Sequence, residues 1–138
     1  MKLELRENMY IRTKDGIIAK VYYIDNDTIF FDKELYRTYG DSIDFLEKDN
    51  LERIVKASYN IIDLIEVGDY LNGFKVSKIE RYDTNTIIKI GNSTFNVLEG
   101  EKIYTPSYDN NNGYEKIEKL KSIVTHEQME QMAYKVGE

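Results

Sequence analysis

Short runs of alternating apolar and polar residues recur along the chain, and most end at turn-forming residues. Ile17–Ile24 would place Ile17, Ala19, Val21 and Tyr23 on one face, as expected for a half-buried strand. Gly16 precedes this run, and Asp25-Asn26-Asp27 follows it as a turn into a second strand over Thr28–Phe31. We interpret the Asp25–Asp27 oxygens as part of this turn, not as a calcium loop, because no glutamate follows at EF-hand spacing.

The second half of the chain repeats this pattern. The Asn72-Gly73 turn joins two predicted strands, and Asp83-Thr84-Asn85 and Gly91-Asn92 mark the next turns. The predicted strands are Asp69–Leu71, Phe74–Arg81, Thr86–Ile90 and Thr94–Val97.

Two short helices are predicted from capping signals. Ser58 is a candidate N-cap before Tyr59–Ile62, and Thr125 with Gln128 has the spacing of a capping box. After each helix an apolar stretch, Leu64–Val67 or Ala133–Val136, is expected to form a strand.

The order of these signals indicates an internal repeat. Lys20–Ile29 and Lys78–Ile87 share Lys, Val/Ile, Asp, Thr and Ile in register. Several strands, a helical turn and a closing strand are typical of an SH3-like barrel. We therefore expect a mainly β protein of two tandem SH3-like small barrels, over residues 1–62 and 63–138. Units of this size are marginal alone and should fold together.

Two segments interrupt the repeat at similar places, residues 36–50 and 104–114. Tyrosines flanking an arginine can stack on a base and pair with a phosphate, or form an interface hot spot. They can equally be ordinary rim aromatics of a sheet. The candidate binding residues are Tyr36, Arg37, Tyr39, Tyr104, Tyr108 and Tyr114.

The composition of the chain excludes several kinds of functional site. The chain has no cysteine and one histidine, so we expect no disulfide, no metal site and no cofactor. No nucleophile elbow or phosphate-binding glycine loop is present, and neither His126 nor the Glu99–Glu101 pair suffices to predict catalysis. We therefore expect a protein that is not an enzyme.

A net charge of −6 argues against generic duplex DNA binding and suits docking on a basic nucleic-acid-binding partner. No apolar run reaches the roughly 18 residues of a membrane span, and no signal-peptide core is visible. A cytoplasmic location without membrane contact is expected.

Ile61–Gly73 and Ser122–Met129 resemble a module of small uncharacterised proteins from phages and prophages of low-GC Gram-positive bacteria. The resemblance covers roughly residues 54–138. It implies an accessory phage protein acting in the cytoplasm of an infected or lysogenic bacterial host. Such proteins are often counter-defence factors.

The leading hypothesis is a binding protein that inhibits a host bacterial defence protein. A second hypothesis is a sponge for a cyclic or ADP-ribose-type nucleotide second messenger, with Tyr36, Arg37 and Tyr39 lining a pocket at a homo-oligomer interface. A third is a virion assembly or tail accessory protein, and a fourth is a small hydrolase.

Overall fold

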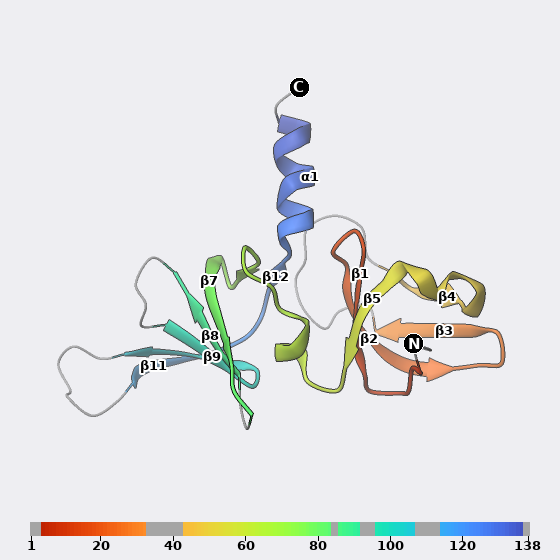
Figure 1. Cartoon of the computed structure of the whole chain (residues 1–138), viewed down its shortest axis with the longest axis horizontal. Helices are drawn as coiled ribbons and strands as arrows, with labels where there is room; N and C mark the ends of the chain where they lie inside the picture. Colours follow the sequence, from red (N-terminus) through yellow and green to blue (C-terminus); the bar gives the residue numbers. More distant parts are fainter. Residues whose placement is uncertain (1–3, 33–42, 84–85, 92–95, 107–113, 137–138) are drawn as a thin grey trace.

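The fold is mainly β, as predicted, and consists of two antiparallel sheets with one α-helix at their junction (Figure 1). This computed structural model describes residues 4–32, 43–83, 86–91, 96–106 and 114–136; for residues 105–106, 114–116 and 133–136 it describes the backbone alone. We call β1–β5 with η1 the first unit, and β6–β12 with η2 the second unit.

The first unit is a five-stranded sheet with the order β4-β3-β2-β1-β5. Its elements are β1 (Tyr10–Thr13), β2 (Ile18–Ile24), β3 (Thr28–Asp32), β4 (Phe45–Glu47), the 3₁₀ helix η1 (Lys48–Arg53) and β5 (Ile54–Ser58). The predicted strands in this part of the chain are confirmed, because β2 and β3 lie at the expected places. The predicted turn is also found: the Asp25 carboxylate accepts a hydrogen bond from the Asn26 backbone, and Asp25 N–H donates to the Thr28 carbonyl.

The second unit is a seven-stranded sheet with the order β11-β10-β9-β8-β7-β6-β12. Its elements are η2 (Ile61–Leu64), β6 (Tyr70–Leu71), β7 (Phe74–Arg81), β8 (Thr86–Ile90), β9 (Asn96–Glu99), β10 (Lys102–Pro106), β11 (Tyr114–Lys119) and β12 (Ile123–Val124). The Asn72-Gly73 turn is confirmed, since both residues have positive φ, 51° and 86°.

Each unit has its own hydrophobic core, but the second core includes residues of the first unit. The first cluster lies within the first unit and includes Ile11, Val21 and Phe31. The second cluster includes Leu71, Ile88 and Leu98 together with Tyr10 and Ile18 from β1 and β2. The two sheets are therefore packed against each other through buried side chains. The predicted boundary at residues 62/63 falls inside η2, where Ile61 and Leu64 both belong to the second cluster.

The helix α1 (His126–Val136) begins at the predicted capping box and extends away from the junction of the sheets (Figure 1). Thr125 N–H donates to Gln128 Oε1 at 3.0 Å, and Gln128 N–H lies 3.4 Å from Thr125 Oγ1. The predicted closing strand over Ala133–Val136 is wrong, because the helix continues through these residues. A capping box sets only where a helix begins, and the short apolar run after it fits a strand or a helix equally well.

Two further predictions around residue 60 are wrong. Leu64–Val67 is not a strand: Leu64 ends η2, and Leu64 and Ile65 are both fully buried, so the run does not alternate. Ser58 is not the N-cap of the helical turn. Asn60 holds that position, while Ser58 Oγ accepts from Asn60 N–H and donates to Asp63. Ser58 instead closes the turn between β5 and η2.

Within the described part of the chain, α1 is too short and too polar to cross a membrane, and the other described helices are also unable to do so.

Candidate functional site

A buried guanidinium joins the two units at the base of α1. Arg12 of β1 is fully buried and donates to the Leu64 carbonyl at 2.9 Å. Its two terminal nitrogens form a bidentate pair with Asp69, and Nη2 also donates to Glu127 of α1. Burial alone would lower the pKa of Arg12, but the hydrogen bonds and charges of Asp69 and Glu127 raise it. Arg12 is therefore held charged inside the protein.

Asp69 connects three parts of the chain. Besides Arg12, its carboxylate accepts hydrogen bonds from the backbone N–H of Glu66 at 2.7 Å and of His126 at 2.9 Å. His126 is the first residue of α1, where exposed N–H groups and the helix dipole favour a negative charge. One carboxylate thus fixes the turn after η2, the start of α1 and the buried arginine.

Glu66 and His126 form a second, partly exposed pair beside this cluster. His126 Nε2 lies 2.8 Å from Glu66 Oε1, and Lys56 Nζ lies 2.9 Å from Glu66 Oε2. Burial acts to raise the pKa of Glu66, but hydrogen bonds from His126 and Lys56 lower it to about 2. The hydrogen bond to Glu66 raises the pKa of His126 above 6.5.

Glu66, His126 and Glu127 place three ligand-type atoms within 4.8 Å of one another, a spacing that can hold a metal ion. The carboxylates of Glu66 and Glu127, however, already pair with Lys56 and Arg12, respectively. With His126 protonated, three cationic groups (Arg12, Lys56, His126) face three carboxylates (Asp69, Glu66, Glu127), so the cluster is balanced in charge. A divalent cation would be repelled by the buried guanidinium. We interpret the cluster as a structural joint between the two units and α1.

Four aromatic side chains on the surface form a row across β2, β3 and β4, and we call Tyr22, Tyr23, Phe30 and Phe45 the aromatic row. Ring centroids of successive members lie 6.4, 5.9 and 6.4 Å apart. Tyr23 pairs with Phe30 and Phe30 pairs with Phe45 across the sheet, so these three share one face. Tyr22, Tyr23 and Phe45 are 57%, 48% and 54% exposed, and Phe30 between them is half-buried.

A β-bulge creates this row. Val21 pairs with Phe31 and Tyr23 pairs with Phe30, so Tyr22 is an extra residue in β2. The sequence predicts Tyr23 on the same face as Val21, and this prediction is wrong. The extra residue moves Tyr23 to the opposite face, while Val21 stays in the core.

Acidic residues border the row. The exposed carboxylates in the adjoining strands and turns, which we call the acidic rim, belong to Asp25, Asp27, Asp32, Asp44, Glu47 and Asp49. Asp27, Glu47 and Asp49, together with Lys48, also line a shallow hollow of about 260 Å³. Lys48 is exposed and Lys20 half-buried, so carboxylates outnumber cations among the described residues here.

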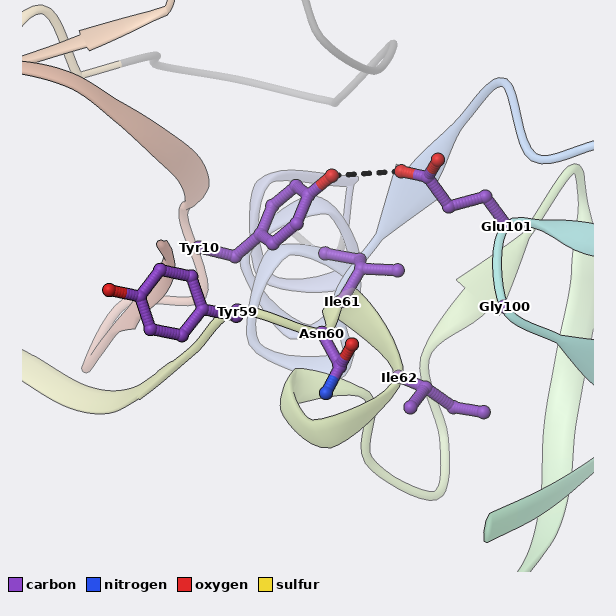
Figure 2. A pocket seen from close by; sticks show the side chains of 7 residues that line it. All are labelled: Tyr10, Tyr59, Asn60, Ile61, Ile62, Gly100 and Glu101. Carbon is purple, nitrogen blue, oxygen red and sulfur yellow. Dashed lines mark hydrogen bonds between the residues drawn. The ribbon is translucent and has the colours of Figure 1, made fainter. Parts of the chain in front are cut away.

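A cleft of about 300 Å³ lies between the two units (Figure 2). Its walls come from β1, from the segment joining the units and from the turn between β9 and β10. Tyr10 Oη donates to Glu101 Oε1 at 2.8 Å and so bridges the two units. The cleft is lined by Tyr10, Tyr59, Asn60, Ile61, Ile62, Gly100 and Glu101.

Most of the sequence-predicted binding residues lie outside the described part of the chain, so their common site stays a prediction. Tyr36, Arg37 and Tyr39 lie outside the described residues, in the chain between β3 and β4, and Tyr108 also lies outside them. Tyr104 is half-buried in β10, opposite Val97 and Ile117. Tyr114 pairs with Pro106, but its side chain is not among those described.

No protein-family model, curated protein or solved structure matches this chain.

Proposed function

We propose that this chain is a protein-binding module that docks through its aromatic row on a basic surface of a partner protein. The observation that carries the proposal is the row itself. Single exposed aromatics are ordinary, but four in contact at one surface are typical of an interaction site. Tyrosine and phenylalanine are enriched at the centres of protein interfaces.

Charge selects the kind of partner. The acidic rim and the net charge of −6 disfavour a nucleic acid and disfavour a second copy, since two rims would then face each other. Arginine and lysine side chains suit both the aromatic row and the acidic rim, because they stack on aromatic faces and pair with carboxylates. A host defence protein that binds nucleic acid presents such a basic surface.

The resemblance to phage accessory proteins supplies the biological setting of this proposal. In that setting the chain acts in the cytoplasm of the bacterial host as a non-enzymatic inhibitor of a defence protein. The aromatic row would compete with nucleic acid for the basic groove of its target.

We further propose that the two units arose by internal duplication of an SH3-like barrel. The order β4-β3-β2-β1-β5 corresponds to β9-β8-β7-β6-β12 if the β10–β11 hairpin is an insertion. Both second strands also carry a bulge, after Val21 in β2 and after Val76 in β7. An experimental structure in which these two valines occupy unrelated positions in their sheets would contradict the duplication.

The docking proposal is tested by NMR titration with an arginine- and lysine-rich peptide, with an acidic peptide of equal length as control. We expect shifts that cluster on the aromatic row and the acidic rim. Tyr23→Ala and Phe45→Ala should each weaken binding about tenfold. Phe74→Ala is the matched control, because Phe74 is 44% exposed on β7, outside the row.

Two results would overturn the proposal. One is a set of shifts spread evenly over the surface. The other is a loss of affinity in Phe74→Ala equal to that in Phe45→Ala.

A further inference from the structure

The outer edge of β11 has no strand beside it among the described residues. β11 is the last strand of the second sheet, pairs with β10 on its inner side, and lies on the side of that sheet away from the first unit (Figure 1). We propose that this edge is an interface between two copies of the chain, which pair their β11 strands antiparallel about a two-fold axis at Ile117. The edge shares no residue with the aromatic row or the acidic rim, so its test is independent of the docking proposal.

The backbone of Ile117 directs its hydrogen-bonding groups toward this open edge. Leu120 N–H donates to the Glu101 carbonyl at 2.8 Å, next to the pair that Lys119 forms with β10. Hydrogen-bonded and non-hydrogen-bonded pairs alternate along an antiparallel ladder, so Lys119 and Ile117 occupy non-hydrogen-bonded positions opposite β10. The Lys119 carbonyl agrees with this direction, because it accepts a hydrogen bond from the Asn72 side chain at 2.9 Å. The N–H and C=O groups of Ile117 are therefore available to a second strand.

The side chain of Ile117 is the exposed end of an apolar row on the outer face of the second sheet. Ile117 lies opposite Tyr104 of β10, which in turn lies opposite Val97 of β9. Tyr104 and Val97 are half-buried, whereas Ile117 at the edge is 58% exposed. In the proposed dimer the two Ile117 side chains form a cross-strand pair, the contact that a neighbouring strand provides inside a sheet. The apolar row then continues from one copy into the other.

The sequence of β11 is self-complementary in charge about Ile117. With Ile117 at the axis, the antiparallel register places Lys119 of one copy opposite Glu115 of the other, and Lys116 opposite Glu118. Residues of opposite charge, not of like charge, therefore lie across from each other. Glu118 already has an interaction within its own chain, so the charge argument rests on exposed Lys119 and its position opposite Glu115. This pattern selects a second copy as the occupant of the edge.

Sedimentation equilibrium of the full chain at increasing concentration tests the interface. The pairing is short, because the register of β11 shifts between Tyr114 and Lys116, so we expect a weak dimer with a Kd of about 0.1 mM. Ile117→Lys places two like charges at the axis and should weaken dimerisation at least about tenfold. Val55→Lys is the matched control and should leave the Kd unchanged, because Val55 is 50% exposed on β5, an edge strand of the first unit. A chain that stays monomeric at about 1 mM, or equal losses in the two variants, would overturn the proposal.

A charge exchange tests the register. Lys119→Glu should weaken dimerisation about tenfold, because the two-fold axis then places carboxylates opposite each other twice. Combining Glu115→Lys with Lys119→Glu restores opposite charges at both places and should return the Kd to that of the wild type. Damage to the fold of β11 would not be rescued in this way. A double variant that dimerises as weakly as Lys119→Glu would refute the proposed pairing.

Cross-linking provides a second, independent measurement. The chain has no cysteine, so Ile117→Cys introduces a single thiol, which in the dimer lies opposite its own copy. Directly opposite residues of antiparallel strands are within the Cα separation that a disulfide requires. Mild oxidation should therefore yield a disulfide-linked dimer of Ile117→Cys, whereas Val55→Cys should stay largely monomeric. Equal cross-linking of the two cysteine variants would contradict an interface at β11.

Discussion

Arg12 and Asp69 are 57 residues apart in the chain and form two hydrogen bonds to each other, although neither side chain is exposed to solvent. The pair joins β1 of the first unit to the turn before β6 of the second. Removing one partner of a buried pair leaves the other charge without compensation, whereas the pair itself is close to neutral for stability.

Asp69→Asn should therefore lower the free energy of unfolding by about 3–5 kcal/mol, as measured by urea denaturation. Glu4→Gln provides the control. Glu4 forms a 3.9 Å ion pair with Arg6 in which both side chains are more than 70% exposed, so a change below about 1 kcal/mol is expected. A loss in Asp69→Asn as small as that of the control would contradict the structural role of the pair.

The Glu66–His126 pair predicts a window of pH in which stability is highest. The lowered pKa of Glu66, about 2 against 4.5, contributes stability above pH 4.5 that is lost as the pH falls toward 2. The raised pKa of His126 contributes stability below pH 6.5 that is lost as the pH rises through its folded value. The pair is fully effective between pH 4.5 and 6.5.

His126→Gln should flatten the alkaline side of this profile. The expected change is less than about 1 kcal/mol, because both side chains are partly exposed. Thermal unfolding across pH measures it. Glu130→Gln serves as control, since its carboxylate is 79% exposed and 4.0 Å from the other ring nitrogen. Parallel profiles of thermal stability against pH for the wild type and His126→Gln would contradict the stabilising role of the Glu66–His126 pair.

Gly16 should tolerate no side chain. Its φ is +87°, and an added Cβ would overlap Thr125 Oγ1 and lie 2.9 Å from Glu127 Cβ. The Gly16 carbonyl also accepts a hydrogen bond from Thr125 Oγ1 at 2.8 Å, at the start of α1. Gly16→Ala is therefore expected to cost more than about 2 kcal/mol of unfolding free energy.

Gly73→Ala separates backbone strain from this contact. Gly73 has nearly the same φ, +86°, but nothing among the described residues lies within 4 Å of its added Cβ. The cost should be about 1–2 kcal/mol from the left-handed backbone alone. Urea denaturation measures the loss of unfolding free energy in both variants. Equal losses would contradict the close contact between Gly16 and the start of α1.

The bulge at Tyr22 predicts that the chain tolerates both a substitution and a deletion at this position. Tyr22→Ala should change stability by less than about 0.5 kcal/mol, because the side chain is 57% exposed. Deleting Tyr22 removes the extra residue and leaves Val21, Tyr23 and Ile24 opposite Phe31, Phe30 and Ile29, as they already are. Tyr23 therefore stays on the surface, and Ile24 stays packed on the first core. We expect a loss of less than about 1 kcal/mol in thermal unfolding, and a loss of several kcal/mol on deletion would argue against the bulge.

Local patterns predicted much of this fold. Alternation located β7 and β8 with their observed bounds, the Asn72-Gly73 dipeptide located a turn, and Thr125 with Gln128 located the start of α1. Each of these signals acts between residues that are close in sequence.

The candidate sites depend on information that is not local. Nothing in the sequence near Arg12 marks it as buried, and its partners Asp69 and Glu127 follow 57 and 115 residues later. The aromatic row needed the bulge in β2, which shifts the alternation by one residue. The paired positions of Tyr23, Phe30 and Phe45 are the signal that could have located the row, once the register of β2, β3 and β4 was known.

The unequal composition of the two cores has a consequence for biosynthesis. The first cluster draws on residues between Leu5 and Ala57, so it can close while the rest of the chain is still being synthesised. The second cluster includes Tyr10 and Ile18 of the first unit, so it is complete only when β1 and β2 are present. We therefore expect the first unit to fold first and the second unit to fold against it, so that folding proceeds from the N-terminal end.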